Sequence, residues 1–146
     1  PQSPSHQVEL RSHDLGTQLF SESGFRISYP ALQHSAVDMI LDGEIRLQSK
    51  ARTLPVDPTE AFSINLLRGS RKAKPYDACD FDALVMYVMP GGTLKGLFVI
   101  PACELQDRGF IGGAAIRSNL RLYPEWSVPR RARSRAAKAW QAKYFV

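Results

Sequence analysis

Residues 37–50 read VDMILDGEIRLQSK and predict two short strands joined by a turn at Asp42-Gly43. A strict two-residue turn pairs Leu41 with Glu44 and mixes apolar and charged residues on both faces of the hairpin. A three-residue loop over 42–44 pairs Leu41 with Ile45 instead, and a β-bulge would have the same effect. One face then carries Val37, Met39, Leu41, Ile45, Leu47 and Ser49, and the other Asp38, Ile40, Arg46, Gln48 and Lys50. The hydrophobic pattern favours this second register.

The hairpin resembles a known family. An acid on the first strand, an Asp-Gly turn and a Gln48-x-Lys50 motif on the second are similar to the PD-(D/E)xK nuclease superfamily. The second motif of that superfamily is usually Glu-x-Lys or Asp-x-Lys. Gln at this place is similar to a subgroup of cyanobacterial group I intron homing endonucleases. The likeness covers residues 8–125 and implies an α/β fold of restriction-endonuclease-like type, a mixed β-sheet flanked by helices. The usual Pro before the acid is absent here.

The resemblance implies hydrolysis of phosphodiester bonds in DNA with Mg²⁺ or Mn²⁺. Mg²⁺ prefers oxygen ligands and keeps several waters, so few protein ligands suffice. Asp38 would anchor the ion, with the Gln48 amide oxygen and the Ser49 carbonyl as further ligands. Lys50 would orient the attacking water or stabilise charge on the phosphate. The family often adds a Glu from the first helix, for which Glu9 is the candidate and Asp14 and Glu22 are alternatives.

Other interpretations of the same residues stay open. Asp38 could be a turn acid, Gln48 a hydrogen-bonding core amide and Lys50 a solvated strand end. The fold could also persist without activity, as a nucleic-acid-binding or assembly module, because Gln removes the charge of the usual acid. A junction resolvase or an RNA-processing nuclease would share the site and differ in substrate.

The distribution of charge predicts a polyanionic partner. The net charge is +5, yet residues 1–67 hold five Lys and Arg against eight acids. Two segments contain cations and no acid, 68–74 and 126–146, and such clusters bind nucleic acid by releasing counterions. The basic tail carries Arg130, Arg131, Arg133, Arg135, Lys138 and Lys143. The predicted DNA contacts are Arg46, Arg52, Arg68, Arg71, Lys72 and Lys74.

Composition favours an intracellular globular protein. Hydrophobic residues make up 44% of the chain and charged residues 23%. No apolar run approaches the ~20 residues that a membrane span needs, so no membrane partner is expected. Cys79 and Cys103 stand apart from the histidines, which argues against a zinc site, and both are expected to be reduced thiols in or near the core.

The expected organisation is one nuclease-like domain over 8–128, after a disordered segment 1–7 and before a basic C-terminal helix within 129–146. The domain begins with a helix over 8–23 that ends at Gly24, followed by a strand over 25–29. Later strands are expected over 62–66, 83–89 and 97–100, the last two at the centre of the sheet. A short helix over 102–108 and an edge strand or extended segment over 114–123 precede the C-terminal helix, whose Ala132, Ala136, Ala139 and Trp140 are expected to face the core. Cutting both DNA strands requires two active sites, so a homodimer or higher oligomer is expected.

Overall fold

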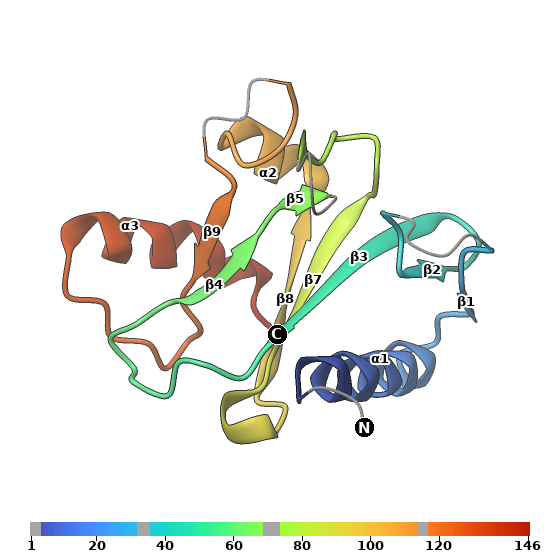
Figure 1. Cartoon of the computed structure of the whole chain (residues 1–146), viewed down its shortest axis with the longest axis horizontal. Helices are drawn as coiled ribbons and strands as arrows, with labels where there is room; N and C mark the ends of the chain where they lie inside the picture. The colour runs from blue at the N-terminus through green and yellow to red at the C-terminus, as the bar shows by residue number, and fades with distance from the viewer. Residues whose placement is uncertain (1–3, 32–35, 69–73, 114–116) are drawn as a thin grey trace.

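A mixed sheet of five strands forms the centre of the computed structural model, which describes residues 4–31, 36–68, 74–113 and 117–146 (Figure 1). The strands are β1 (Ile27–Ser28), β2 (Met39–Leu41), β3 (Ile45–Arg52), β7 (Ala83–Val88) and β8 (Gly96–Pro101), in the order β1-β2-β3-β7-β8. β3 and β7 are parallel, and every other pair in this sheet is antiparallel. The predicted α/β fold with a mixed sheet is confirmed.

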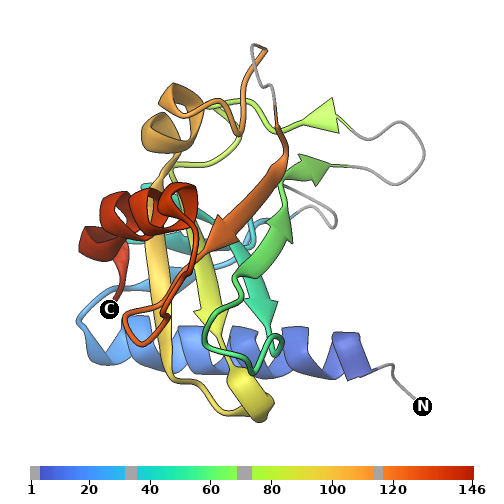
Figure 2. The ribbon, with the colours of Figure 1, turned by 90° about the vertical axis from the view of Figure 1, so that its left-hand side faces the viewer.

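Helices and two small strand pairs cover the sheet. The helices are α1 (Pro4–Glu22), α2 (Ala102–Asp107) and α3 (Ala132–Gln141), with short 3-10 turns η1 (Pro90–Gly92) and η2 (Ala142–Tyr144). β4 (Phe62–Asn65) pairs with β9 (Asn119–Leu122), and β5 (Leu67–Arg68) pairs with β6 (Lys74–Pro75). Figure 2 shows α1 behind the sheet and α3 and β9 in front of it.

Alternation along the strands divides the interior into two cores. β7 is buried along its whole length, as its unbroken apolar sequence requires in the middle of a sheet. Val85 and Tyr87 pack toward α1, together with Met39, Leu41 and Leu47. Leu84, Met86 and Val88 pack on the other face against the β4–β9 pair and α2. Each face of the sheet is therefore covered.

The hairpin adopts the register that the hydrophobic pattern favours. Leu41 pairs with Ile45 and Met39 with Leu47, so residues 42–44 form the loop and the predicted register is confirmed. Asp42 and Gly43 both have positive φ, at 53° and 72°, which explains an Asp-Gly pair at this turn. The two faces are less uniform than predicted, because Val37 and Ile40 pack in the α2 core and Ile45 is 39% exposed.

Helix α1 begins at Pro4, four residues before the predicted start and inside the segment 1–7 that was expected to be disordered. It ends as predicted before Gly24, which has a φ of 96°. The backbone N–H of Phe25 donates to the carbonyl of Phe20 at 3.0 Å and closes the last turn. Gly16 lies directly against the hydroxyl of Tyr87, so the helix approaches the sheet where a side chain is absent.

Two predictions about packing are wrong. β8 is at the end of the sheet, and its free edge is covered by the C-terminal segment, where Leu97 and Val146 exchange two backbone hydrogen bonds. The C-terminal helix begins at Ala132 rather than at Pro129, and its alanines 132, 136 and 139 are exposed. Trp140, the fourth residue of the predicted face, packs against the core as expected, and the polar Gln141 next to it is 1% exposed.

The cysteines also differ from expectation. Cys79 and Cys103 are free thiols but both are exposed, so neither belongs to the core. The part of the chain that the structure describes has no helix that is long and apolar enough to cross a membrane.

Candidate active site

A pocket of about 450 Å³ lies between α1 and the second half of β3. Its walls come from three segments that are far apart in the sequence. The polar residues that line it are Glu9, Ser12 and His13 from α1, Asp38 before β2, and Gln48, Ser49, Lys50 and Arg52 from β3. The acid, the amide and the amine of the predicted site thus share one pocket.

Asp38 is held by the backbone of β3. Because β2 begins only at Met39, the N–H of Ser49 meets a carboxylate instead of a strand carbonyl, and it donates to Asp38 Oδ2 at 2.8 Å. The N–H of Asp38 donates to the carbonyl of Leu47 at 2.7 Å. Burial raises the pKa of Asp38, and the hydrogen bond from Ser49 and the charge of Lys50 oppose that rise. The carboxylate is therefore fixed in place at an energetic cost.

Gln48 is a buried amide with only half of its hydrogen-bonding capacity used. Its side chain is 6% exposed and its Nε2 donates to the carbonyl of Ser49 at 3.3 Å. Its Oε1 has no hydrogen-bond partner among the residues that the structure describes. A buried oxygen left in this state costs about 1–3 kcal/mol, so a group that binds it would recover that energy.

Lys50 is one of two cations that line the pocket, with Arg52. Burial and the neighbouring charge of Arg52 lower the pKa of Lys50, while Asp38 and Glu9 act in the opposite direction. An ammonium group that is partly desolvated next to two carboxylates interacts strongly with an incoming anion, because the local dielectric is lower than that of water.

The structure distinguishes the three candidate acids of the first helix. Glu9 lines the pocket and interacts electrostatically with Asp38, Lys50 and Arg52. Asp14 and Glu22 are not among the residues that line it. Glu9 is therefore the helix acid whose position fits the predicted role.

Sequence reasoning missed two residues of the pocket, His13 and Ser12. His13 interacts electrostatically with Asp38 and packs against the ring of Tyr29 at 4.9 Å between centroids. Ser12 is 5% exposed and its hydroxyl donates to the carbonyl of Glu9. The spacing of Glu9 and His13, four residues apart and so on one helix face, is the signal that could have identified the histidine.

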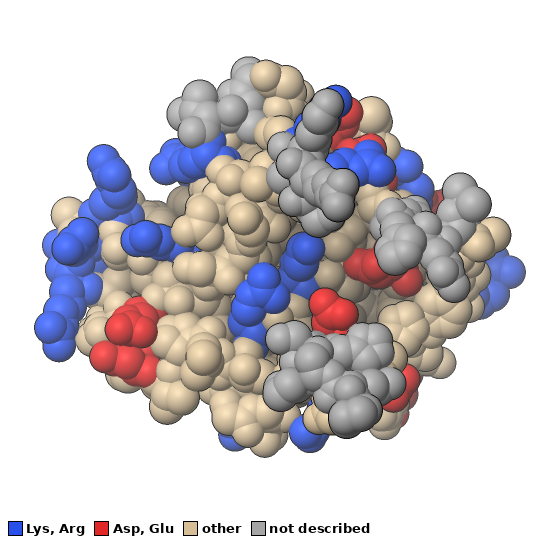
Figure 3. All heavy atoms as spheres, viewed as in Figure 1, with Lys and Arg blue, Asp and Glu red and all other residues tan. Residues whose placement is uncertain are grey.

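The predicted DNA contacts separate into different groups. Arg52 lines the pocket and its Nε donates to the carbonyl of Ser63 at 3.1 Å. Arg46 is engaged elsewhere, with its Nε 3.3 Å from Asp82 Oδ2, and Arg68 forms an ion pair with Asp80 at 3.1 Å. Lys74 is exposed on β6, and Arg71 and Lys72 lie outside the described residues. In the view of Figure 3, basic side chains lie near the middle of the molecular surface, next to acidic ones.

Most of the groups in the pocket that could bind a metal ion are oxygen donors, and His13 adds nitrogen. Among the described residues there is no group of three or more His, Cys, Asp or Glu that could hold a metal ion. Oxygen ligands are available from the carboxylates of Asp38 and Glu9, which line the pocket, and from the amide of Gln48, whose Oε1 is buried. This set suits a hard cation that keeps most of its waters.

A mixed sheet flanked by helices, with this pocket between α1 and β3, defines an α/β protein of restriction-endonuclease-like fold. A family model described as MepB-like matches residues 34–146, and the chain belongs to the MepB-like family.

Two solved structures have a similar fold. A crystal structure of MepB aligns with a TM-score of 0.62 at 20% identity and covers 92% of this chain and 95% of that one. The structure of a bacterial homing endonuclease, I-Ssp6803I, aligns with a TM-score of 0.65 at 18% identity and covers 97% of this chain and 94% of that one. No curated protein sequence matches the chain. At these identities the likeness establishes the fold.

Proposed function

We propose that this protein is a DNA endonuclease that hydrolyses phosphodiester bonds with Mg²⁺ or Mn²⁺. The observation that carries the proposal is the pocket in which Asp38, Gln48 and Lys50 meet, with Glu9 from the neighbouring helix. The nuclease-like fold and the similarity to a bacterial homing endonuclease support it. Hydrolysis of DNA is the chemistry that suits an acid, an amide and a partly buried lysine around one small hollow.

The residues present fit a divalent cation. Asp38 and Gln48 would hold it, because Gln48 Oε1 is a buried oxygen that lacks a partner among the described residues and the Asp38 carboxylate is positioned by Ser49. The carbonyl of Ser49 is the predicted third ligand. When bound, such an ion polarises the scissile phosphate and lowers the pKa of a bound water.

The protein's own groups supply the remaining steps. Lys50 stabilises the negative charge that develops on the phosphate, and its partial burial strengthens that interaction. Glu9 and His13 lie on the opposite wall, where either side chain can accept a proton from the attacking water or hold it by hydrogen bonding. Arg52, bound to the carbonyl of Ser63, fixes the far end of the pocket and attracts the next phosphate.

Cleavage of supercoiled plasmid with Mg²⁺, and again with EDTA, tests the proposal. Lys50→Ala is expected to reduce cleavage at least ~100-fold, since it removes the cation that faces the transition state. Lys95→Ala is the matched control, because Lys95 is exposed and outside the pocket, and it should cleave like the wild type. Equal cleavage by Lys50→Ala and wild type, each freed of contaminating nuclease, refutes the assigned mechanism.

A non-catalytic nucleic-acid-binding module is the second candidate. Two observations favour it: the neutral Gln48 occupies the place of an acid, and no cluster of three acidic or metal-binding side chains exists among the described residues. This alternative predicts DNA binding without plasmid cleavage at any Mg²⁺ or Mn²⁺ concentration. Gln48→Glu, which restores the usual acid, would then introduce cleavage that the wild type lacks.

Cutting both strands of duplex DNA requires two active sites, and we propose a homodimer or higher oligomer. Sedimentation with and without duplex DNA tests this. Double-strand cleavage by a species that remains monomeric on DNA would refute it.

A further inference from the structure

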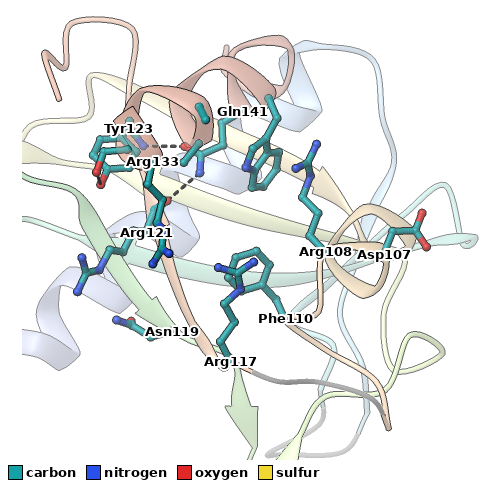
Figure 4. A pocket seen from close by; sticks show the side chains of 13 residues that line it. Asp107, Arg108, Phe110, Arg117, Asn119, Arg121, Tyr123, Arg133 and Gln141 are labelled. Atoms are coloured by element: carbon teal, nitrogen blue, oxygen red, sulfur yellow. Dashed lines mark hydrogen bonds between the residues drawn. The ribbon is translucent and has the colours of Figure 1, made fainter. Parts of the chain in front are cut away.

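A second pocket, remote in sequence from the first, lies between α2, β9 and α3 and has a volume of about 770 Å³. Most of its charged residues are arginines, and two of them lie over aromatic rings. We name it the arginine pocket and define it by Arg108, Phe110, Arg117, Arg121, Arg133 and Trp140 (Figure 4). One acid, Asp107, is among its lining residues, and Figure 4 shows its carboxylate turned away from the arginines.

Of the arginines of this pocket, only Arg108 has an acidic partner among the residues that the structure describes. Arg108 forms an ion pair with Glu104 at 3.0 Å and its guanidinium lies 4.1 Å above the Trp140 ring. Arg117 lies over the ring of Phe110 at 5.0 Å. In the parts of the chain that the structure describes, Arg117, Arg121 and Arg133 have no carboxylate partner. Three guanidinium groups around one hollow repel one another, and an anion bound between them would relieve that repulsion.

The walls of the arginine pocket are held rigidly. The buried side chain of Gln141 joins α3 to β9, because its Oε1 accepts from the N–H of Tyr123 at 2.8 Å and its Nε2 donates to the carbonyl of Arg121 at 2.7 Å. The hydroxyl of Tyr123 and that of Ser134 are 3.0 Å apart and add a third link. Arg121 of β9 and Arg133 of α3 therefore lie on two elements that these hydrogen bonds hold together, which lowers the entropy cost of binding a ligand.

The cationic surface continues from this pocket toward the candidate active site. A further hollow of about 500 Å³ shares Arg121, Tyr123, Arg133 and Ser134 with the arginine pocket and adds Arg130 and Arg131, together with one acid, Glu60. The same hollow is lined by Ser63, whose carbonyl accepts the hydrogen bond from Arg52 of the active-site pocket. An extended chain of phosphates suits such a surface better than one compact anion does.

We propose that the arginine pocket and the adjoining hollow bind the phosphate backbone of the DNA strand outside the cleavage site. Bidentate pairing with phosphate is the chemistry that planar guanidinium groups perform best. This inference deepens the proposed function, since the polyanion is the substrate of that same enzyme. The principal DNA contacts are then expected on β9 and α3 rather than at Arg46 of the hairpin.

Fluorescence polarisation with labelled DNA in EDTA, where no cleavage occurs, tests the inference. Arg117→Ala and Arg133→Ala should each weaken binding about 10-fold, the loss of one charge-assisted contact, and reduce the salt dependence by about one unit of slope. Arg135→Ala is the matched control, because it removes the same charge from α3 at an exposed residue that does not line the pocket. Thermal unfolding verifies that each variant is folded, and Arg133→Lys should retain part of the affinity.

Two results would overturn the inference. One is equal weakening by Arg133→Ala and Arg135→Ala, which would indicate a general effect of net charge. The other is competition by a nucleoside monophosphate as effective as that by duplex or single-stranded DNA, which would indicate a mononucleotide site. Lys50→Ala separates this test from that of the proposed function, since it should bind DNA in EDTA like the wild type. Loss of binding in the arginine variants, in a protein that never cleaves plasmid, would support the strand site and refute the nuclease.

Discussion

Replacing Gln48 by Leu is expected to make the protein more stable and less active. Gln48 is 6% exposed, and its Oε1 has no hydrogen-bond partner among the described residues. Relieving an unsatisfied buried oxygen returns about 1–3 kcal/mol, whereas the weak bond that is lost, from Nε2 to the carbonyl of Ser49, contributes about 0.5–1 kcal/mol. Leu has a similar shape, so the net gain is about 1 kcal/mol, or a rise of about 2–4 °C in the unfolding temperature for a chain of this length.

Urea denaturation with and without Mg²⁺ measures this effect, together with plasmid cleavage. Wild type should gain stability from Mg²⁺ through binding to the folded state, and Gln48→Leu should lose that gain together with most of its cleavage. Gln18→Leu is the matched control, because Gln18 is exposed on α1 and its replacement should change stability by less than about 0.5 kcal/mol. A loss of stability above about 1 kcal/mol in Gln48→Leu would show that Oε1 has a partner, and the reasoning would fail.

Three further predictions address the pocket, the helix contact and the docking of α3. Burial raises the pKa of Asp38, so the stability that Asp38 contributes is fullest below about pH 4 and is lost as the pH rises through the raised pKa. Asp38→Asn should therefore be more stable than wild type at pH 7 but not at pH 3.5. An equal difference in stability at both pH values in denaturant titrations would contradict this. Gly16→Ala should destabilise the protein by about 2 kcal/mol in thermal unfolding, because the new methyl group would clash with the buried Tyr87 hydroxyl. Adding Tyr87→Phe should restore part of the lost stability, and additive effects of the two substitutions would refute the contact. Gln141→Leu should lower the free energy of unfolding by about 2–4 kcal/mol, because it leaves the Tyr123 N–H and the Arg121 carbonyl unpaired. A change within about 0.5 kcal/mol in urea denaturation would mean that α3 docks by other contacts.

The hairpin shows how far local reasoning reaches. Asp42-Gly43 demands positive φ, and the apolar residues Met39, Leu41 and Leu47 can share a buried face only in one register. Both constraints lie within fourteen consecutive residues, so the sequence sufficed to fix the register that pairs Met39 with Leu47 and Leu41 with Ile45. The unbroken apolar run of β7 likewise indicated a buried central strand. The roles assigned to Asp38, Gln48 and Lys50 stay predictions that the experiments above address.

The C-terminal helix shows where local reasoning fails. Apolar residues at helical spacing predicted a docking face through Ala132, Ala136, Ala139 and Trp140, yet the three alanines are exposed and α3 docks through Trp140 and Gln141. The edge of β9 offers an N–H and a carbonyl that need partners, and a glutamine satisfies both while an alanine satisfies neither. Which backbone groups lie free at that edge depends on the pairing of β4 with β9, more than fifty residues apart.

The sequence by itself determined the strands, the turn and the alternation that put an acid, an amide and an amine on one hairpin, because these depend on side-chain periodicity and on allowed backbone angles. Only the tertiary structure decided that Glu9 and His13 of α1 face that hairpin, and that arginines from α2, β9 and α3 surround a second pocket. Those placements arise from packing between segments distant in the chain, and no local pattern encodes the distance between them.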